Sequence, residues 1–212
     1  VEKLSYSSTQ PGKLTAQLLP AIIDTALAKL PIPKRMRWGA SRNEFVRPVH
    51  WVVLLFGNEV ITTNILGVES GNQTVGHRFH HPEKIKIGKP GDYESLLENP
   101  GNVIADFTTR RELIRSAIVA EGKKLNASTV VDEALLDEVT SLVEYPVALT
   151  GKFDELFLDV PSEALILAMK SHQKCFYLVD EHNELLPYFV TVSNIRSTDP
   201  AQVIEGNERV IR

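Results

Sequence analysis

The chain has 212 residues, of which 43% are hydrophobic and 24% are charged. This composition is typical of a globular protein and excludes a disordered chain. The longest largely apolar run, Val49–Phe56, is far shorter than the roughly 20 residues of a membrane-spanning helix, and the N-terminus has no signal-peptide pattern. The single cysteine, Cys175, excludes an internal disulfide and a cysteine-rich zinc site. We therefore expect a cytoplasmic protein with no membrane association.

The charge is unevenly distributed along the chain. A net charge of −4 argues against a protein that coats nucleic acid indiscriminately. Residues 29–50 nevertheless carry six cations against one carboxylate, Glu44, which leaves the rest of the chain strongly acidic. This asymmetry indicates one local basic face.

The first predicted element is a helix that ends near residue 30. Apolar residues from Leu18 to Leu30 recur at three- and four-residue spacing, which predicts one apolar stripe on a helix. Pro20 is expected to start or kink this helix, because proline cannot donate to the preceding turn. Pro31 and Pro33 are expected to end it.

A β-hairpin is predicted next, with strands at Val49–Phe56 and Val60–Leu66 around a Gly57-Asn58 turn. Its first strand is rich in β-branched and aromatic residues, so we expect it to be buried on both faces. Residues 70–74 are predicted to form a polar loop, and residues 85–87 a short strand.

The remainder mixes helices and strands without a regular βαβ cycle. The predicted fold class is therefore α+β, with mixed or antiparallel sheets and packed helices. Helices are expected at residues 92–98, 107–125, 132–142, 162–170 and 199–212. Strands are expected at residues 147–149, 176–179 and 188–192, and residues 103–105 are interpreted as a strand or a buried helix entry. The last helix lacks a stop signal and the chain lacks an initiator Met, so we expect a fragment of a longer protein.

Motifs for autonomous nucleotide chemistry are missing. The sequence has no P-loop, no dinucleotide-binding glycine motif and no nucleophile elbow. Carboxylates from Asp132 to Glu144 occur at helical spacings and are interpreted as a solvated face. These features weaken the case for an independent ATP enzyme.

Two histidine patterns have a chemical and a structural interpretation. His77, His80 and His81 could ligate a metal, but a zinc site needs further ligands, so we favour a solvated cluster. Cys175 follows His172 by three residues, which resembles a thiolate–imidazole pair. A small residue entering a strand is the favoured interpretation of Cys175.

The segment 33–47 carries the clearest signal for binding. Its cations can contact phosphates, and an interleaved tryptophan offers a stacking plane. The segment precedes a predicted strand, so a rigid scaffold could position it. The alternative is that the aromatic residues are core edges and the cations ordinary surface, and the residues alone leave both open. The candidate RNA-binding residues are Lys34, Arg35, Arg37, Trp38, Arg42 and Arg47.

Seven motifs in order resemble the beta subunit of the bacterial heterotetrameric glycyl-tRNA synthetase. They are LPIPKRMRWG (30–39), FVRPVHW (45–51), GHRF (76–79), VIADF with the following arginine pair (103–111), SLVEYPV (141–147), VSNI (192–195) and GNERVIR (206–212). The departures from the family pattern are Tyr145 and Cys175, where Trp and Tyr are expected.

The resemblance implies an α2β2 enzyme that joins glycine to tRNA(Gly) with ATP. In that family the alpha subunit carries the adenylation site with ATP and Mg²⁺, and the beta subunit supplies tRNA recognition. The chain would then be about a third of a beta subunit, without the HD-like region and the anticodon-binding domain. Its expected partners are the alpha subunit, tRNA(Gly) and the rest of the beta subunit. Its expected role is that of a non-catalytic module that binds tRNA and organises subunits, with no catalytic residue, metal or cofactor of its own.

The resemblance also implies a fold similar to the B3/B4 editing-type module of the phenylalanyl-tRNA synthetase beta chain. The expected division is an N-terminal helical segment (1–30), an α+β domain (31–198) and the start of a further helix (199–212). Two alternative functions remain open. One is hydrolysis of aminoacyl esters in a pocket at His77 and Arg78, and the other is a purely structural spacer.

Overall fold

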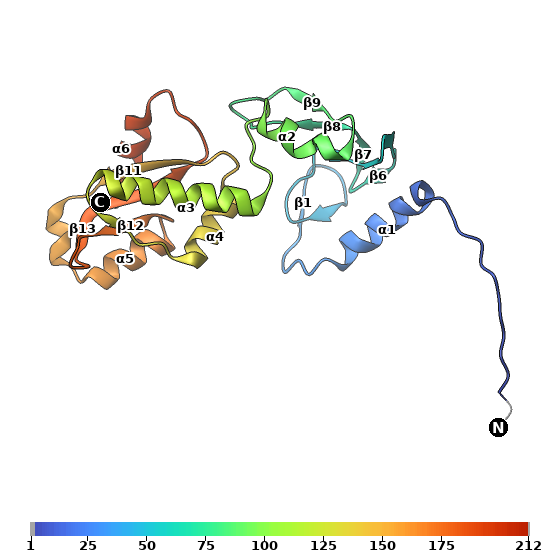
Figure 1. The fold of residues 1–212 in the computed structure, drawn as a ribbon, viewed down its shortest axis with the longest axis horizontal. Helices are drawn as coiled ribbons and strands as arrows, with labels where there is room; N and C mark the ends of the chain where they lie inside the picture. Colours follow the sequence, from blue (N-terminus) through green and yellow to red (C-terminus); the bar gives the residue numbers. More distant parts are fainter. Residues whose placement is uncertain (1–2, 212) are drawn as a thin grey trace. The chain divides into compact units, whose positions relative to one another are not determined.

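The computed structural model describes residues 3–211, and Figure 1 shows the course of the chain. Its contacts define two compact units: unit 1 comprises Val1–Thr74 and Lys86–Asp92, and unit 2 comprises Val75–Ile85 and Tyr93–Arg212. The predicted α+β class is confirmed, because helices occur together with several small, mostly antiparallel sheets. The expected boundary at residue 30 falls inside unit 1, and the one at residue 198 falls inside unit 2. The division into residues 1–30, 31–198 and 199–212 stays a prediction.

Unit 1 begins with helix α1, Thr15–Lys29. The prediction for Pro20 is wrong as a start signal, because the helix begins before Pro20 and includes it. Leu30 leaves the helical conformation, so the predicted end before Pro31 is confirmed. The apolar residues lie on more than one face and none is fully buried: Ile23 is half-buried, whereas Ile22 is 54% exposed. The single apolar stripe is therefore too simple a description of this helix.

The strands of unit 1 are short. Strand β3 (Val52–Val53) pairs in parallel with β7 (Val68–Gly71), which pairs antiparallel with β6 (Asn64–Ile65). Strands β4 (Leu55–Phe56) and β5 (Glu59–Val60) form the predicted hairpin around Gly57-Asn58.

The expected burial of the first hairpin strand on both faces is wrong. Val52 and Val53 are only half-buried, and Phe56 is 49% exposed. The reason is the small core, since Ile61, Ile65 and Ile87 are the fully buried apolar side chains among the described residues of unit 1. A core of this size cannot cover both faces of a strand.

The prediction of a polar loop at residues 70–74 is also wrong, because strands β7 and β8 (Gln73–Val75) cover most of this segment. The Ser70 hydroxyl donates to the carbonyl of Ile61 at 2.8 Å and accepts from the amide of Thr63 at 2.9 Å. The Thr74 hydroxyl accepts from the indole of Trp51 at 3.1 Å. Because these hydroxyls are satisfied inside the protein, polar residues can occupy buried strand positions. The strand expected near residue 85 is confirmed as β9 (Lys84–Lys86).

Unit 2 is built on a four-stranded antiparallel sheet in the order β10-β12-β13-β11. Its strands are β10 (Ser128–Thr129), β11 (Val147–Lys152), β12 (Phe176–Val179) and β13 (Leu185–Ser193). Alternate residues face opposite sides of such a sheet. Phe176 and Val190 belong to one buried cluster and Cys175 and Phe189 to a second, so the sheet has a core on each face.

Helices form the layers on both sides of this sheet. Helices α3 (Phe107–Lys124) and α4 (Glu133–Leu142) supply Ile114, Ile118 and Leu136 to the first core. Helix α5 (Ser162–Ser171) supplies Met169 to the second, beside the 3-10 helix η2 (Glu155–Asp159). Unit 2 therefore has helices on each face of a central sheet, and the helices and strands expected between residues 107 and 193 are confirmed.

The remaining helices are short or terminal. A 3-10 turn, η1 (Pro90–Asp92), precedes α2 (Tyr93–Glu98). Helix α6 (Pro200–Ile211) begins as predicted, since the carboxylate of Asp199 accepts from the amide of Gln202 at 3.3 Å. The predicted continuation at Arg212 lies outside the described residues. Residues 103–105 form neither a strand nor a helix entry, because Ile104 instead donates its amide to the carbonyl of Glu144 at 3.0 Å.

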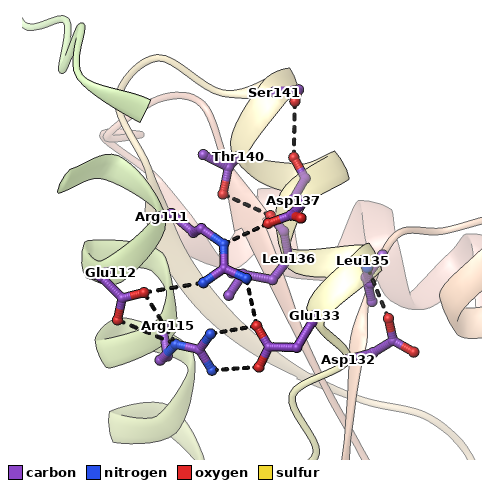
Figure 2. A network of polar contacts seen from close by, with 10 residues as sticks. All are labelled: Arg111, Glu112, Arg115, Asp132, Glu133, Leu135, Leu136, Asp137, Thr140 and Ser141. Carbon is purple, nitrogen blue, oxygen red and sulfur yellow. Dashed lines mark hydrogen bonds and ion pairs between the residues drawn. The ribbon is translucent and has the colours of Figure 1, made fainter. Parts of the chain in front are cut away.

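The carboxylates of α4 were expected to form a solvated face. This expectation needs correction, because some of them form ion pairs with arginines of α3. Arg111 of α3 contacts Glu133 and Asp137, each at 2.5 Å. Arg115 forms two hydrogen bonds with Glu133, at 2.6 and 2.9 Å. Figure 2 shows both guanidinium groups reaching across from α3 to the α4 carboxylates. This network joins the two helices that cover one face of the sheet.

The network predicts an acid-sensitive contribution to stability. Hydrogen bonds from Arg115 and Arg111 lower the pKa of Glu133 to about 2. A carboxyl with a lowered folded-state pKa stabilises the protein above its unfolded-state pKa, and this contribution is lost as the pH falls toward the folded-state value. We expect Glu133→Gln to lower the urea midpoint at pH 6 and to have a smaller effect at pH 3. The control is Glu94→Gln, because Glu94 is exposed on α2 and forms no ion pair with any residue that the structure describes. An equal effect of Glu133→Gln at both pH values would contradict the prediction.

Candidate nucleic-acid interface

The predicted RNA-binding residues of unit 1 lie in and beside a small antiparallel hairpin. Strand β1 (Met36–Arg37) pairs with β2 (Glu44–Phe45), with Met36 opposite Phe45 and Arg37 opposite Glu44. Residues 38–43 form the connecting loop, in which Gly39 adopts a positive φ of 58°. We call residues 33–47 the basic hairpin. The hairpin brings the predicted cations onto one short segment with a defined backbone.

Two of these cations have partners within unit 1. Arg35 donates to the carbonyls of Leu27 and Ala28 at 3.3 and 3.2 Å, so it satisfies the otherwise open C-terminal end of α1. The Arg37 Nε lies 2.5 Å from a carboxylate oxygen of Glu44 on the neighbouring strand. These contacts give Arg35 and Arg37 a structural role in fixing the hairpin.

The other three cations are available for an external ligand. Lys34, Arg42 and Arg47 are exposed, and within residues 3–211 none of them has a carboxylate partner. Trp38 is half-buried, and its carbonyl accepts from the Ser41 hydroxyl at 3.4 Å. The hairpin therefore combines three unpaired cations with a partly accessible indole, which is a combination suited to phosphates and bases.

The second predicted site, at His77 and Arg78, is a turn in unit 2. The His77 amide donates to the carbonyl of Gly101 at 2.6 Å, and the His81 amide donates to the carbonyl of His77 at 2.8 Å. The His77 Nδ1 accepts from the amides of Phe79 and His80 at 3.2 and 3.3 Å. We call residues 76–81 the histidine turn. The side chain of His77 fastens this turn from inside.

This geometry bears on the hydrolytic alternative. A neutral imidazole whose Nδ1 accepts hydrogen bonds carries its proton on Nε2. The Nε2 atom of His77 is buried and has no partner in the structure, and the residue is 1% exposed. A general base needs a free lone pair within reach of water, and His77 has none. Arg78 is exposed whereas His77 is buried, and a pocket shared by the two stays a prediction.

Sequence reasoning missed a cluster of residues around this turn. His80 stacks on His77 with ring centroids 4.6 Å apart, and the edge of Tyr145 approaches His80 at 5.4 Å. The His80 Nε2 accepts from the backbone amide of Arg196 at 3.0 Å, while the Arg196 guanidinium donates to the Tyr145 hydroxyl at 2.7 Å. Burial lowers the pKa of His80, and repulsion from His77, when it is protonated, and from the Arg196 guanidinium lowers it further. The sequence had indicated the closely spaced histidines, and the departure at Tyr145 was its signal for the surrounding residues.

The remaining chemical candidates have structural explanations. Among the described residues, no group of three His, Cys, Asp or Glu side chains is arranged to hold a metal ion. Cys175 is fully buried directly before β12, and burial raises the pKa of its thiol to about 11. A thiol with such a pKa stays protonated near neutral pH and is a poor nucleophile. No helix within residues 3–211 has the length and apolar character to cross a membrane.

Comparison with known proteins relates this chain to one class, the aminoacyl-tRNA synthetases. The chain is 56% identical over 209 residues to the glycine–tRNA ligase beta subunit of Hahella chejuensis (strain KCTC 2396). The aligned region covers 99% of this chain and 30% of that protein. The corresponding proteins of Chromohalobacter salexigens and Marinobacter nauticus are 56% and 52% identical, over 99% of this chain and 30% of each relative.

The family model described as glycyl-tRNA synthetase beta subunit matches residues 1–212. The chain therefore belongs to the glycyl-tRNA synthetase beta subunit family, and the resemblance seen in the seven motifs is confirmed. It spans about 30% of the length of the curated relatives that it matches.

Proposed function

We propose that this chain is a non-catalytic module of a cytoplasmic glycine–tRNA ligase, in which it contacts tRNA(Gly) and helps to organise the subunits. The observation that carries the proposal is the basic hairpin of a chain with net charge −4. Its residues Lys34, Arg42 and Arg47 are exposed and have no carboxylate partner in the described part of the chain. Unpaired cations on a fixed backbone suit the phosphates of a nucleic acid. Family membership supports tRNA as that nucleic acid.

The bond-making chemistry is proposed to take place on the alpha subunit. The sequence carries none of the common nucleotide-binding motifs, and the two reactive candidates, His77 and Cys175, are both buried. We accordingly assign ATP, Mg²⁺ and glycine to the alpha subunit, and tRNA(Gly), the alpha subunit and the rest of the beta subunit as the partners of this chain. The similarity to the B3/B4 editing-type module forms part of this proposal. Its support is the α+β architecture with a sheet covered on both faces.

The test replaces the three unpaired cations, Lys34, Arg42 and Arg47, by Ala in the full-length beta subunit assembled with alpha. We expect the KM for tRNA to rise about tenfold with little change for glycine or ATP, because only phosphate contacts are removed. The slope of log KM against log salt should fall by about 2, since each lost phosphate contact contributes roughly 0.7–0.9.

Two further variants give this test its controls. The first replaces three exposed lysines elsewhere that form no ion pair among the described residues, Lys13, Lys86 and Lys123. It removes the same charge and should change the KM for tRNA much less. Arg37→Ala should lower the stability of the hairpin through the loss of the Glu44 contact. Equal tRNA kinetics and equal salt slopes in the hairpin variant and the wild type would overturn the RNA contact and leave the spacer role.

A further inference from the structure

The histidine turn holds an aromatic side chain out in solvent. Phe79 is 72% exposed, although the residues on either side of the turn are anchored in unit 2. An isolated exposed apolar residue is ordinary on a protein surface. Phe79 differs in its surroundings, because its ring centroid lies 6.1 Å from that of the buried His77 while most of the residue stays exposed.

Three contacts make this turn rigid. The amides of Phe79 and His80 both donate to the buried Nδ1 of His77. Gly76 is enclosed by backbone, since an added Cβ would lie 2.6–2.8 Å from atoms of Gly101 and His81. His80 is fixed by its stacking on His77 and by the amide of Arg196. The position of the Phe79 backbone is thus set before any ligand arrives.

Two exposed arginines belong to the turn or contact it through His80. Arg78 precedes Phe79 in the turn and is exposed, and within residues 3–211 it has no ion pair. Arg196 is exposed too, and its guanidinium lies 5.5 Å from the centre of the Tyr145 ring, without a carboxylate partner among the described residues. The carboxylate of Glu83, by contrast, lies 3.3 Å from His81.

We propose that Phe79, Arg78 and Arg196 form a second RNA-binding site, which takes an unpaired nucleotide of the tRNA. The base stacks on the ring of Phe79, and the two guanidinium groups contact the neighbouring phosphates. This inference rests on the proposed function, because it names a further contact to the same substrate. It lies in unit 2 and uses none of the residues of the basic hairpin.

The chemistry favours RNA over a protein partner. A protein interface needs an apolar centre from which charges are depleted. Here the turn carries one exposed ring together with Arg78, and Arg196 contacts the turn through His80. Neither arginine has a carboxylate partner within residues 3–211. A nucleotide needs both parts, a flat apolar surface for the base and cations for the phosphates. The fixed backbone also reduces the entropy lost on binding.

The experiment uses the assembled enzyme and compares substitutions at Phe79. We expect Phe79→Ala to weaken tRNA binding about tenfold, Phe79→Trp to bind like the wild type, and Phe79→Leu to behave like Phe79→Ala because leucine has no stacking face. Replacing Arg78 and Arg196 by Ala should reduce the salt slope of binding, by up to about 2. Leu156→Ala, at an equally exposed apolar residue of unit 2, is the control and should leave tRNA binding unchanged.

Photocrosslinking identifies the partner directly. A photoreactive phenylalanine derivative at position 79 should crosslink to tRNA in the assembled enzyme. Crosslinks to a protein subunit only, or wild-type tRNA binding by both Phe79→Ala and the Arg78 and Arg196 variant, would overturn this inference. If this inference failed but the Lys34, Arg42 and Arg47 variant still bound tRNA more weakly, the proposed function would stand. If no variant changed tRNA binding, the proposed function and this inference would both be wrong.

Discussion

Replacing Phe189 by Ala is expected to lower the free energy of unfolding of unit 2 by about 3–5 kcal/mol. Phe189 is fully buried in β13, in the core between the sheet and α5. The ring also covers Gly151 on the neighbouring strand β11, where the two residues are direct partners. A Cβ at Gly151 would lie 2.3 Å from the Cζ of Phe189. The ring therefore fills the space that a side chain at residue 151 would take.

This arrangement makes a second substitution informative. Gly151→Ala should cost about 1–3 kcal/mol, because the ring of Phe189 must move out of its place in a tightly filled core. In the double variant the new methyl group enters the space that the ring has left. We expect the double variant to be more stable than the sum of the single effects predicts, by about 1 kcal/mol.

Hydrogen exchange at the amides of β11 and β13 is the suitable measurement, because a chain with two compact units need not unfold in one step. Leu156→Ala truncates a side chain that is 74% exposed and should change these amides little. Additive effects of Phe189→Ala and Gly151→Ala would contradict the packing argument.

The sequence predicted the fold best where one strong local rule decided the outcome. Asp132 accepts from the amide of Leu135, and helix α4 begins where this capping residue indicates. The 3.6-residue pattern that brings Ile114 and Ile118 to one face was equally reliable. These signals act within a few residues of the chain.

Prediction of burial and of ion pairs failed where residues far apart in the sequence determine them. The strands at residues 68–75 contain serine and threonine, and their burial depends on acceptors and donors at Ile61, Thr63 and Trp51. The ion pairs of α4 depend on arginines about 20 residues away on α3. Composition cannot show such partners, because it does not say which residues the fold brings together.

For the basic hairpin, the sequence predicted which residues could bind RNA but not how their side chains are arranged. All six proposed residues of the basic hairpin lie in one segment, but the sequence could not separate Arg35 and Arg37, which have internal partners, from the unpaired cations. It placed His77 in a solvated cluster, with a reactive group as the alternative, and the solvated interpretation is wrong for His77 because this residue is 1% exposed. The structure shows His77 fixing a turn, with Phe79 at its exposed end.

Gly76→Ala is expected to open the histidine turn and to lower the stability of its surroundings by more than about 2 kcal/mol. The added Cβ would lie 2.6 Å from the carbonyl oxygen of Gly101, 2.7 Å from that of His81 and 2.8 Å from the Cα of Gly101. All three are backbone atoms, so no flexible side chain can move aside. The turn must shift, and the 2.6 Å hydrogen bond from the His77 amide to Gly101 breaks.

Hydrogen exchange measures the effect of Gly76→Ala on the turn, and tRNA binding measures its effect on the proposed site. The amides of His77 and His81 should lose protection in Gly76→Ala, while those of α3 keep theirs. Gly206→Ala in α6 meets nothing within 4 Å and should be neutral or stabilising, since alanine favours a helix over glycine. Because Phe79 needs the fixed turn, Gly76→Ala should weaken tRNA binding about as much as Phe79→Ala does. Lost protection with unchanged tRNA binding would show that the rigidity of this turn serves the fold alone.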